Sequence, residues 1–417
     1  MKQQETTNQR QRVVATGIGG ITPLGQDWPT IVTALKSHEC AIQLMPDWQK
    51  IEGLVCHMAA PCDFSPPDHY RRRTLRSMGR VAQLAVRASE LALAQAGYKK
   101  GDDWLSSGQV GVAYGSAQGS VEGMQEFFGL LNDHTTQELK STSYIRAMTH
   151  TAPVNIGVYF GLTGRILTTT TACTAASQAI GYAFEAIQNG QQTMMLAGGA
   201  DELTAIHSAV FDSLLATSQS NDSPTTASRP FDKDRDGLVL GEGGCTFVLE
   251  SLEHAHARGA TILGEIAGFA TNADGAHITR PQASTQTLCM EMALANADLS
   301  ASDIGFVSAH ATATEYGDAA EVTALQAADL GDTPVASLKG HIGHTLGACG
   351  SIEAWAALMM MNDGWFAPTL NLGEPNCGEL DYLMGDGREI DTQYVMSNNF
   401  AFGGINTSLI FKRWLDD

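Results

Sequence analysis

The sequence predicts an α/β fold in which helices cover both faces of parallel-rich sheet layers. Short apolar runs of strand length alternate with longer stretches of helical periodicity. A similar alternation restarts after the loop at residues 218–237. Glycines stand where several of the expected strands and helices end. Alternation of this kind is typical of sheets that are buried on both faces by helices.

The expected elements form two series along the chain. In the first, residues 12–16 form a buried strand that ends at the glycine run 17–20, and residues 79–96 form an amphipathic helix that ends at Gly97. A strand at 109–114, a helix over 175–189 and a strand at 194–196 follow. The second series comprises a strand over 304–309, helices over 318–328 and 351–361, and strands at 394–397 and 408–411. No clear linker separates the two series.

Composition excludes several classes of protein. A formal net charge of −20 argues against nucleic-acid binding, which needs a basic face. No apolar run approaches the length of a membrane span, and the polar opening through Arg12 predicts no signal peptide. The eight cysteines are scattered without a C-x-x-C spacing. This pattern predicts reduced thiols in a cytoplasmic protein, with neither a disulfide framework nor a zinc site.

One cysteine stands where a thiol can react. Cys173 follows a β-branched run at 168–171, and small, helix-favouring residues begin at Ala175. These surroundings predict a strand-to-helix turn, where free backbone N–H groups and the helix dipole favour thiolate over thiol. A buried, inert cysteine is the alternative, because free cysteine packs like a small apolar residue.

Three later segments place polar or aromatic groups at strand ends or in loops. His310 follows an expected strand, Lys339 and His344 share one glycine-rich stretch, and Phe402 lies in another at 398–406. Each segment alone is also typical of a structural residue or a turn. A cysteine with separated histidines fits a Cys-protease-like pair as well, and spacing does not choose between these interpretations.

A basic segment stands out in this acidic chain, and it consists of Arg71, Arg72, Arg73 and Arg76. One interpretation is a solvated turn at the start of a helix. The other is a docking patch for an acidic macromolecule, because local potential steers association whatever the net charge.

Over nearly its whole length the chain resembles the β-ketoacyl-[acyl-carrier-protein] synthases of the thiolase superfamily, elongating (KAS I/II) type. The turn around Cys173 is similar to the nucleophile motif of that family. His310 with Thr312 and Thr314 resembles its first histidine motif, and residues 339–344 match its Lys-x-x-x-Gly-His segment. Residues 228–237, followed by Gly-Glu-Gly at 241–243, are also highly typical of these enzymes.

The resemblance implies a fold and a reaction. The fold would be a thiolase-like, five-layered α-β-α-β-α sandwich built from two pseudo-repeated halves. Residues 1–255 would carry the nucleophile, and residues 256–417 the two histidines and a gating loop. The enzyme would be an acyltransferase, a 3-oxoacyl-[acyl-carrier-protein] synthase, that loads an acyl chain on Cys173. Decarboxylative Claisen condensation with malonyl carrier protein would then give the 3-oxoacyl product, in fatty-acid or polyketide (aryl-polyene-type) biosynthesis.

The resemblance also implies the roles of the catalytic groups. The backbone N–H groups of Cys173 and Phe402 would hold the oxyanion, and His310 and His344 would stabilise the enolate through Nε2. Phe402 would also gate entry of the second substrate.

Other residues would orient the histidines or bind the substrate arm and the carrier protein. Lys339, paired with Glu321, would orient the histidines, and Thr312 and Thr314 would bind the phosphopantetheine amides. Carrier-protein docking would fall to Arg71, Arg72, Arg73 and Arg76, because acyl carrier proteins are strongly acidic. The substrate would arrive on the phosphopantetheine of the carrier, with no bound cofactor or metal. A dimer joined along the sheet edges is implied, either a homodimer or a heterodimer with a related ketosynthase-like subunit.

Departures from the family pattern surround the catalytic set without touching it. They are Thr174, Ala175 and Ala176 after the nucleophile, Ala311 and Glu315 near His310, and Ala401 and Ile405 in the gating loop. They leave open both the acyl chain length and whether the added Cβ of Ala401 alters gating, since a Cβ restricts φ and ψ in a loop that must move. Two other functions are weighed: a chain-length-factor-like partner subunit, which would lack the nucleophile, and a thiolase acting on coenzyme A thioesters, which would use a second cysteine as base.

Overall fold

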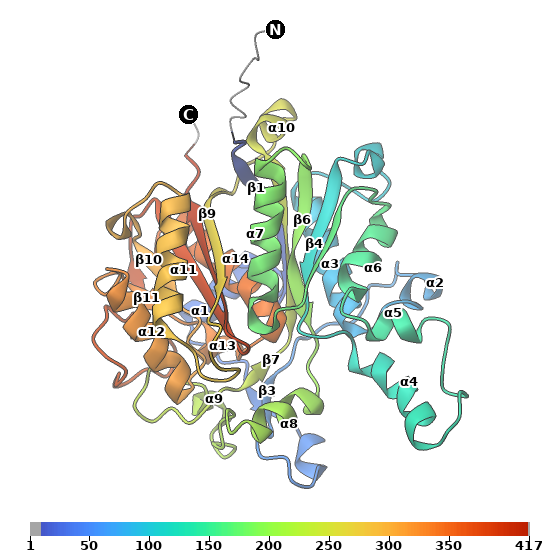
Figure 1. Cartoon of the computed structure of the whole chain (residues 1–417), viewed down its shortest axis with the longest axis horizontal. Helices are drawn as coiled ribbons and strands as arrows, with labels where there is room; N and C mark the ends of the chain where they lie inside the picture. The colour runs from blue at the N-terminus through green and yellow to red at the C-terminus, as the bar shows by residue number, and fades with distance from the viewer. Residues whose placement is uncertain (1–9, 416–417) are drawn as a thin grey trace.

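The chain folds around a long mixed sheet with helices on both sides (Figure 1). The computed structural model describes residues 10–415, so most of the segment in which no signal peptide is expected lies outside the described residues. In order of pairing the strands are β11 (Val335–Ala336), β10 (Phe306–Ser308), β14 (Tyr394–Ala401), β15 (Ile405–Lys412), β9 (Gly264–Ala273), β1 (Val13–Ile21), β8 (Gly243–Ser251), β6 (Met194–Asp201), β4 (Val110–Gly115) and β5 (Ile166–Thr169).

The two halves of this sheet repeat one pairing pattern. From the centre outward, β1–β8–β6 and β9–β15–β14 are each two antiparallel pairs. Next, β6–β4–β5 and β14–β10–β11 are each two parallel pairs. The halves join where residues 13–15 of β1 pair with residues 264–266 of β9. The pseudo-repeat is therefore confirmed, but the expected parallel-rich layers are wrong, because antiparallel pairs fill the middle of the sheet.

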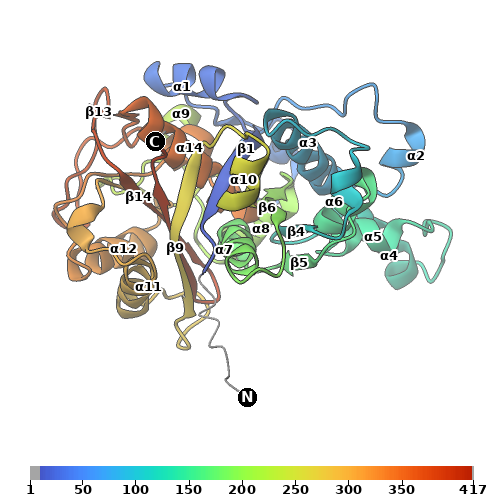
Figure 2. The same cartoon turned by 90° about the horizontal axis from the view of Figure 1, so that it is seen from above.

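Two helices form a layer between the halves. The helices α7 (Ala175–Gln188) and α14 (Cys349–Asp363) pack on each other and contact strands of both halves. They lie in the middle of the molecule in Figure 2. Both are buried on nearly every side, as expected of helices without a charged face.

Outer helices complete five layers, in agreement with the predicted sandwich. The first half is covered by α3 (Arg80–Gln95) and α6 (Thr151–Phe160), and the second by α11 (Ala283–Asn296) with α12 (Glu315–Ala327) beside it. The other helices are α1 (Trp28–Lys36), α2 (Arg72–Leu75), α4 (Val121–Asn132), α5 (Ser143–Ala147), α8 (Ala205–Ser213), α9 (Pro224–Ala227), α10 (Leu252–Ala257) and α13 (Lys339–Ile342). Short strands β2 (Gln43–Leu44), β3 (Met58–Ala60) and β7 (Leu240–Gly241) form a small second sheet, and β12 (Trp365–Phe366) pairs with β13 (Arg388–Glu389).

The glycine run 17–20 lies inside β1, so the expected end of the strand at residue 16 is wrong. A Cβ at Gly17 would lie 2.2 Å from the carbonyl oxygen of Ala92 in α3, and one at Gly19 would lie 2.4 Å from its nitrogen. These glycines therefore allow α3 to approach the strand, and they do not make a turn.

The expected loop at 398–406 is a tight hairpin. Strand β14 continues to Ala401 and β15 begins at Ile405, so Phe402, Gly403 and Gly404 alone form the turn. The φ angles of Gly403 and Gly404 are +95° and +72°, a region that glycine adopts without strain. The Gly403 N–H donates to the carbonyl of Ile278 at 2.7 Å, which holds the turn against the loop after β9.

No helix within residues 10–415 is long and apolar enough to cross a membrane. The eight cysteines are free thiols.

Candidate active site

Cys173 lies between β5 and α7, in the one-turn helix Ala172–Thr174, as the sequence predicts. Ala172 has a φ of +49°, a conformation that is strained for a residue with a side chain. Two hydroxyls hold the turn: Thr174 donates to the Thr171 carbonyl at 2.7 Å, and Thr169 donates to the Ala175 carbonyl at 2.8 Å. The thiol therefore sits at the start of α7 on a turn that local hydrogen bonds fix.

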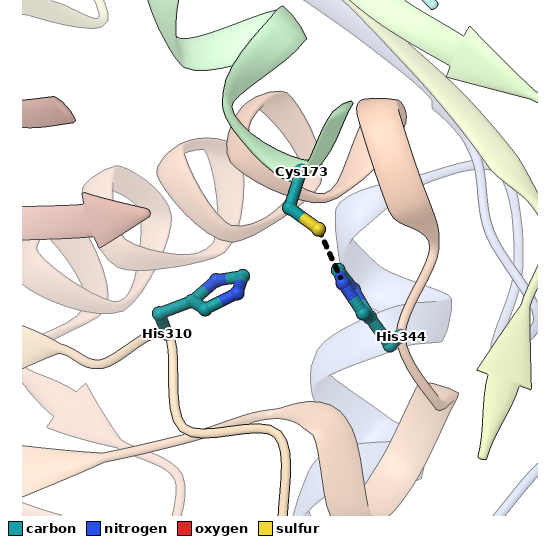
Figure 3. Close-up of side chains that lie close together, drawn as sticks. All are labelled: Cys173, His310 and His344. Atoms are coloured by element: carbon teal, nitrogen blue, oxygen red, sulfur yellow. Dashed lines mark hydrogen bonds between the residues drawn. The ribbon is translucent and has the colours of Figure 1, made fainter. Parts of the chain in front are cut away.

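Both predicted histidines meet this thiol (Figure 3). His310 follows β10, and His344 lies between α13 and the one-turn helix Leu346–Ala348 that leads into α14. The Nε2 atom of His344 is 2.9 Å from Cys173 Sγ, and the two imidazole rings are 5.2 Å apart between centroids. Cys173 thus forms one buried cluster with two histidines that lie more than a hundred positions further along the chain.

Burial decides the protonation of this cluster. It raises the pKa of Cys173 to about 12, although the Lys339 charge and the backbone N–H groups of Phe402 and Cys173 lower it. In the free enzyme burial therefore opposes the thiolate that the helix start was expected to favour. Burial, together with the Lys339 charge, also holds the pKa of His310 and of His344 well below the usual value. Both imidazoles are neutral near pH 7.

Lys339 is fully buried, and its ion-pair partner is Glu353 of α14, not the expected Glu321. Glu321 uses both carboxylate oxygens elsewhere: they accept the backbone N–H groups of His310 at 2.8 Å and Ala311 at 2.7 Å. The correction has a simple cause. Glu321 lies under the backbone that follows β10, so it fixes the chain carrying His310, whereas Glu353 faces the Lys339 ammonium directly.

A cavity of about 390 Å³ leads to the cluster. This volume lies in the range of small-molecule sites. Thr312 and Thr314 line it, with their hydroxyl oxygens 3.0 Å apart, and Phe402 lines it with its ring 5.7 Å from that of Phe211. At its mouth Leu215 is 90 % exposed. The structure therefore brings the predicted thiol, both histidines, both threonines and Phe402 to one cavity.

The arginine segment lies elsewhere. Arg71, Arg72, Arg73 and Arg76 are exposed on and beside α2, at the far end of the molecule from α12 in both Figure 1 and Figure 2. Among the described residues none of the four side chains makes an ion pair or a hydrogen bond.

Three residues of the site went unnoticed in the sequence. They are Glu353, Asn399 and Cys349, and all three are buried. The Cys349 thiol donates to the Cys173 carbonyl at 3.2 Å, although its sequence context gave no sign of such proximity. Glu353 did carry a signal, since a lone acidic residue in the apolar stretch 351–361 must be paired when buried.

The cluster offers donor atoms of the kind that bind zinc. Those of Cys173, His310 and His344 lie within 4.8 Å of one another, as do those of His310, Cys349 and Glu353. The Lys339 ammonium, however, lies 3.4 Å from His310 Nδ1 and is already bonded to Glu353. Its charge opposes a second cation at either place, so we assign no metal to these groups.

The thiolase-like sandwich and the buried Cys–His–His cluster together define a class of enzyme that acts on thioesters. Residues 10–255 match the model of the "Beta-ketoacyl synthase, N-terminal domain", and residues 263–373 match that of the "Beta-ketoacyl synthase, C-terminal domain". The chain belongs to the β-ketoacyl synthase family.

Two curated relatives and a crystal structure agree with this assignment. The chain is 33 % identical to 3-oxoacyl-[acyl-carrier-protein] synthase 2 of Vibrio harveyi, over 97 % of this chain and 99 % of that one. It is 34 % identical to a putative polyketide beta-ketoacyl synthase 1 of Streptomyces halstedii, over 96 % and 97 % of the two chains. A crystal structure of a beta-ketoacyl synthase from Burkholderia phymatum is 53 % identical and matches with a TM-score of 0.96, covering 97 % of this chain and all of that one. The chain is therefore a condensing ketosynthase of the kind that serves fatty-acid or polyketide synthesis.

Proposed function

We propose that Cys173 is the nucleophile that accepts the acyl chain from a carrier thioester. Attack by sulfur on the thioester carbonyl forms the new C–S bond and expels the carrier thiol. The thiol proton of Cys173 leaves with the carrier thiol, and the Nε2–H group of His344, 2.9 Å from Sγ, stabilises the negative charge that forms on sulfur. The Lys339 charge assists, because it lowers the pKa that burial raises. The observation that carries this proposal is the convergence of Cys173, His310 and His344 at the bottom of one cavity.

The backbone N–H groups of Cys173 and Phe402 stabilise the tetrahedral oxyanion. Both already act on the sulfur, since they lower the pKa of Cys173. Fixed N–H donors of this kind lower a barrier only where charge develops in the transition state. Phe402 lies in the turn between β14 and β15. Movement of that turn would therefore move the Phe402 N–H donor of the oxyanion site and open or close the entrance to the cavity at the same time.

His310 and His344 act in the second half of the reaction. Malonyl carrier protein loses its carboxylate as carbon dioxide, which leaves an enolate on the thioester oxygen. Two neutral imidazoles that donate through Nε2 stabilise this charge as it forms, and the low pKa of both rings supports that role. The carbanion then attacks the Cys173 thioester and expels the cysteine thiolate, which releases the 3-oxoacyl product on the carrier.

Lys339 and Glu321 position the histidines in different ways. Lys339 contacts His310 Nδ1 at 3.4 Å, while Glu321 fixes the backbone that carries His310. Thr312 and Thr314 line the route to the thiol, and we assign them to the amides of the phosphopantetheine arm. The substrate itself supplies that arm, so the enzyme needs no cofactor or metal of its own.

An acyl carrier protein is the partner of this reaction, and its docking site includes Arg71, Arg72, Arg73 and Arg76. Their exposure and their freedom from ion pairs within the described chain support this assignment, because unpaired arginines attract an acidic surface. We also propose a cytoplasmic enzyme, in keeping with eight free thiols.

The chain works as a dimer joined along β5, with either a second copy or a related ketosynthase-like subunit. Strand β5 is the last strand of its half and exposes Ile166, and Val158 of α6 is exposed as well. An open, uncharged edge strand favours pairing with another chain. Within the chain we place the division between the halves at residues 255 and 256, in α10, so that residues 1–255 hold the nucleophile and 256–417 the histidines and gate.

Neither alternative function receives support from the site. A chain-length-factor-like subunit has no use for a nucleophile, and Cys173 is present with both histidines. A thiolase needs a second cysteine as base. Cys349 is close, but its thiol donates to the Cys173 carbonyl and burial holds its pKa well above the usual value. A thiol in that state is a poor base.

The proposal is tested by separating the two half-reactions. His310→Ala should slow malonyl decarboxylation by about 100-fold or more, the loss seen when one oxyanion donor is removed, while Cys173 is still acylated. His341→Gln is the matched control, since this histidine is buried nearby but its ring bonds the Glu39 carbonyl and is not part of the cavity lining. Decarboxylation at the normal rate in His310→Ala would remove that residue from the mechanism.

A further inference from the structure

The hydrogen bonds behind His310 close into a ring of four side chains. Lys339 Nζ lies 3.4 Å from His310 Nδ1, and Asn399 Nδ2 also lies 3.4 Å from that atom. Glu353 joins the two donors, because one of its oxygens accepts from Lys339 and the other accepts from Asn399 at 2.7 Å. All four side chains are buried, so water does not compete for these bonds.

The orientation of the Asn399 amide follows from this ring. Its NH2 group must face Glu353, because its oxygen would be repelled by the carboxylate. The second N–H points toward His310 Nδ1 and, at 3.6 Å, toward Cys349 Sγ. The amide oxygen has no hydrogen-bond partner among the described residues and lies against Gly350, where an added Cβ would be only 2.8 Å away.

Groups from every neighbouring element leave His310 Nδ1 without an acceptor. Lys339 on α13 carries donors only, and Asn399 on β14 presents its NH2 group. Glu353 on α14 is bonded to both of those donors, and Glu321 on α12 is bonded to backbone N–H groups. Cys349 donates its thiol to a carbonyl, and His344 faces Cys173. At hydrogen-bond distance, a proton on Nδ1 would therefore meet the donors of Lys339 and Asn399.

We propose that Asn399 is a positioning residue that holds His310 in the tautomer with its proton on Nε2. Lys339 supplies one donor to Nδ1, and Asn399 supplies the second and keeps its own oxygen turned away. The Nε2–H group is then directed into the cavity before substrate arrives. The importance of that proton for catalysis rests on the decarboxylating role proposed above for His310.

Asn399→Asp tests the proposal with almost no change in shape. The new carboxyl group lies against Glu353, and two carboxylates at that distance share one proton. The Asp oxygen that takes the place of Nδ2 faces both Glu353 and His310, so with the shared proton on Glu353 it offers His310 Nδ1 an acceptor, which favours the opposite tautomer. In ¹⁵N spectra of histidine-labelled protein, the Nδ1 signal of His310 should move from the position of a bare ring nitrogen to that of a protonated one. The signal is assigned by its loss in His310→Gln.

The matched control is Asn398→Asp. Asn398 is the preceding residue of β14 and faces the other side of the sheet, where it contacts Met290 at 3.2 Å and Ser408 at 2.7 Å. The Asn398→Asp variant introduces the same buried carboxyl group without contact to His310, so the Nδ1 signal of His310 should not move. Should Asn399→Asp fail to fold, Asn399→Ser removes the second donor, and the Nδ1 signal should then shift part of the way.

Activity separates this proposal from the function on which it rests. In Asn399→Asp, malonyl decarboxylation should fall by about 100-fold while acylation of Cys173 stays within about threefold. An unchanged Nδ1 signal in both Asn399 variants, or an equal shift in Asn398→Asp, would overturn the positioning role. A tautomer change with normal decarboxylation would uphold the positioning role and contradict the catalytic role of His310.

Discussion

Lys339 is a fully buried cation, and one acidic partner keeps it charged. Burial is the largest single effect on the pKa of Lys339 and lowers it, but the opposing interactions, led by the charge of Glu353, together raise that pKa. A buried pair of this kind adds little net stability, but it leaves an isolated charge when one member is removed. Burial is the main cause of the low pKa of both histidines, and the positive charge of Lys339 lowers that pKa further and also lowers the pKa of Cys173.

The corrected pairing makes a prediction for stability. Lys339→Met should lower the free energy of unfolding by roughly 3–5 kcal/mol, because Glu353 is left buried without a counter-charge. The double variant Lys339→Met/Glu353→Leu should regain most of that loss, whereas Lys339→Met/Glu321→Leu should not. Urea unfolding of the four proteins measures both effects. If Glu321→Leu recovered the free energy of unfolding and Glu353→Leu did not, Lys339 would pair with Glu321, as expected from the sequence, and the pairing with Glu353 would be contradicted.

At the residue scale, sequence predicted which side chains meet in the cavity better than it predicted their protonation. Cys173, His310 and His344 each stand in a recognisable motif, so their convergence in one cavity could be expected. The protonation state of Cys173 could not be predicted, because it depends on how completely the folded chain excludes water from that thiol. Glu353 was missed for a related reason, since its pairing with Lys339 depends on how α13 and α14 meet.

At the scale of elements, glycine was the main source of error. The run at 17–20 was expected to end a strand, but its missing side chains instead allow α3 to pack on β1. Around Phe402 the turn was correctly anticipated and only its length was wrong, because β14 and β15 pair up to Ala401 and Ile405. Sequence alone does not separate a glycine that turns the chain from one that admits a neighbouring helix.

The element formed by α4 and α5 is held by one buried carboxylate, and this makes it sensitive to acid. Although burial raises the pKa of Glu126, hydrogen bonds from Lys140, Ser143 and Arg146 lower it to about 2, against 4.5 for a free glutamate. A carboxyl group whose pKa is lowered on folding stabilises the protein above its unfolded pKa. That contribution is lost as the pH falls from about 4.5 toward 2.

Glu126→Gln should therefore weaken α4 and α5 by about 1–2 kcal/mol at pH 7, as read from hydrogen exchange of their amides. The difference from the native protein should shrink as the pH is lowered from 5 to 3. Glu122→Gln is the control, because this residue is mostly exposed and its ion pair within residues 10–415 is with Arg146, at 3.2 Å. A stability difference between Glu126→Gln and the native protein that grows as the pH falls would contradict the lowered pKa of Glu126.

At the scale of the molecule, the repeated halves explain how distant residues meet. Cys173 lies between the outer strand of the first half, β5, and the middle helix α7. His344 lies between the outer strand of the second half, β11, and the middle helix α14. Because α7 and α14 pack on each other, these two matching positions face one another. The two series of elements were visible in the sequence, but the layer that joins them was implied only by family resemblance.

The charge of the whole molecule sets the conditions for carrier binding. A chain of net charge −20 repels an acidic carrier at long range, so a local basic surface must offset this repulsion. Arg72→Glu/Arg76→Glu should weaken carrier affinity by about tenfold at low salt, and by less as salt is added. Lys36→Glu/Lys50→Glu makes the same change of charge on exposed residues elsewhere. Equal losses of carrier affinity in both double variants would show that only the net charge matters, and this would contradict docking at the arginine segment.

The central claim is that Cys173 holds the acyl chain during condensation. Incubation with acyl carrier protein, followed by intact mass measurement and peptide mapping, tests it most directly. The peptide that contains Cys173 should gain the mass of one acyl group. Cys173→Ala should gain none, even though another buried thiol, that of Cys349, remains beside it. An acyl group on any other residue, or acylation that persists in Cys173→Ala, would contradict the account.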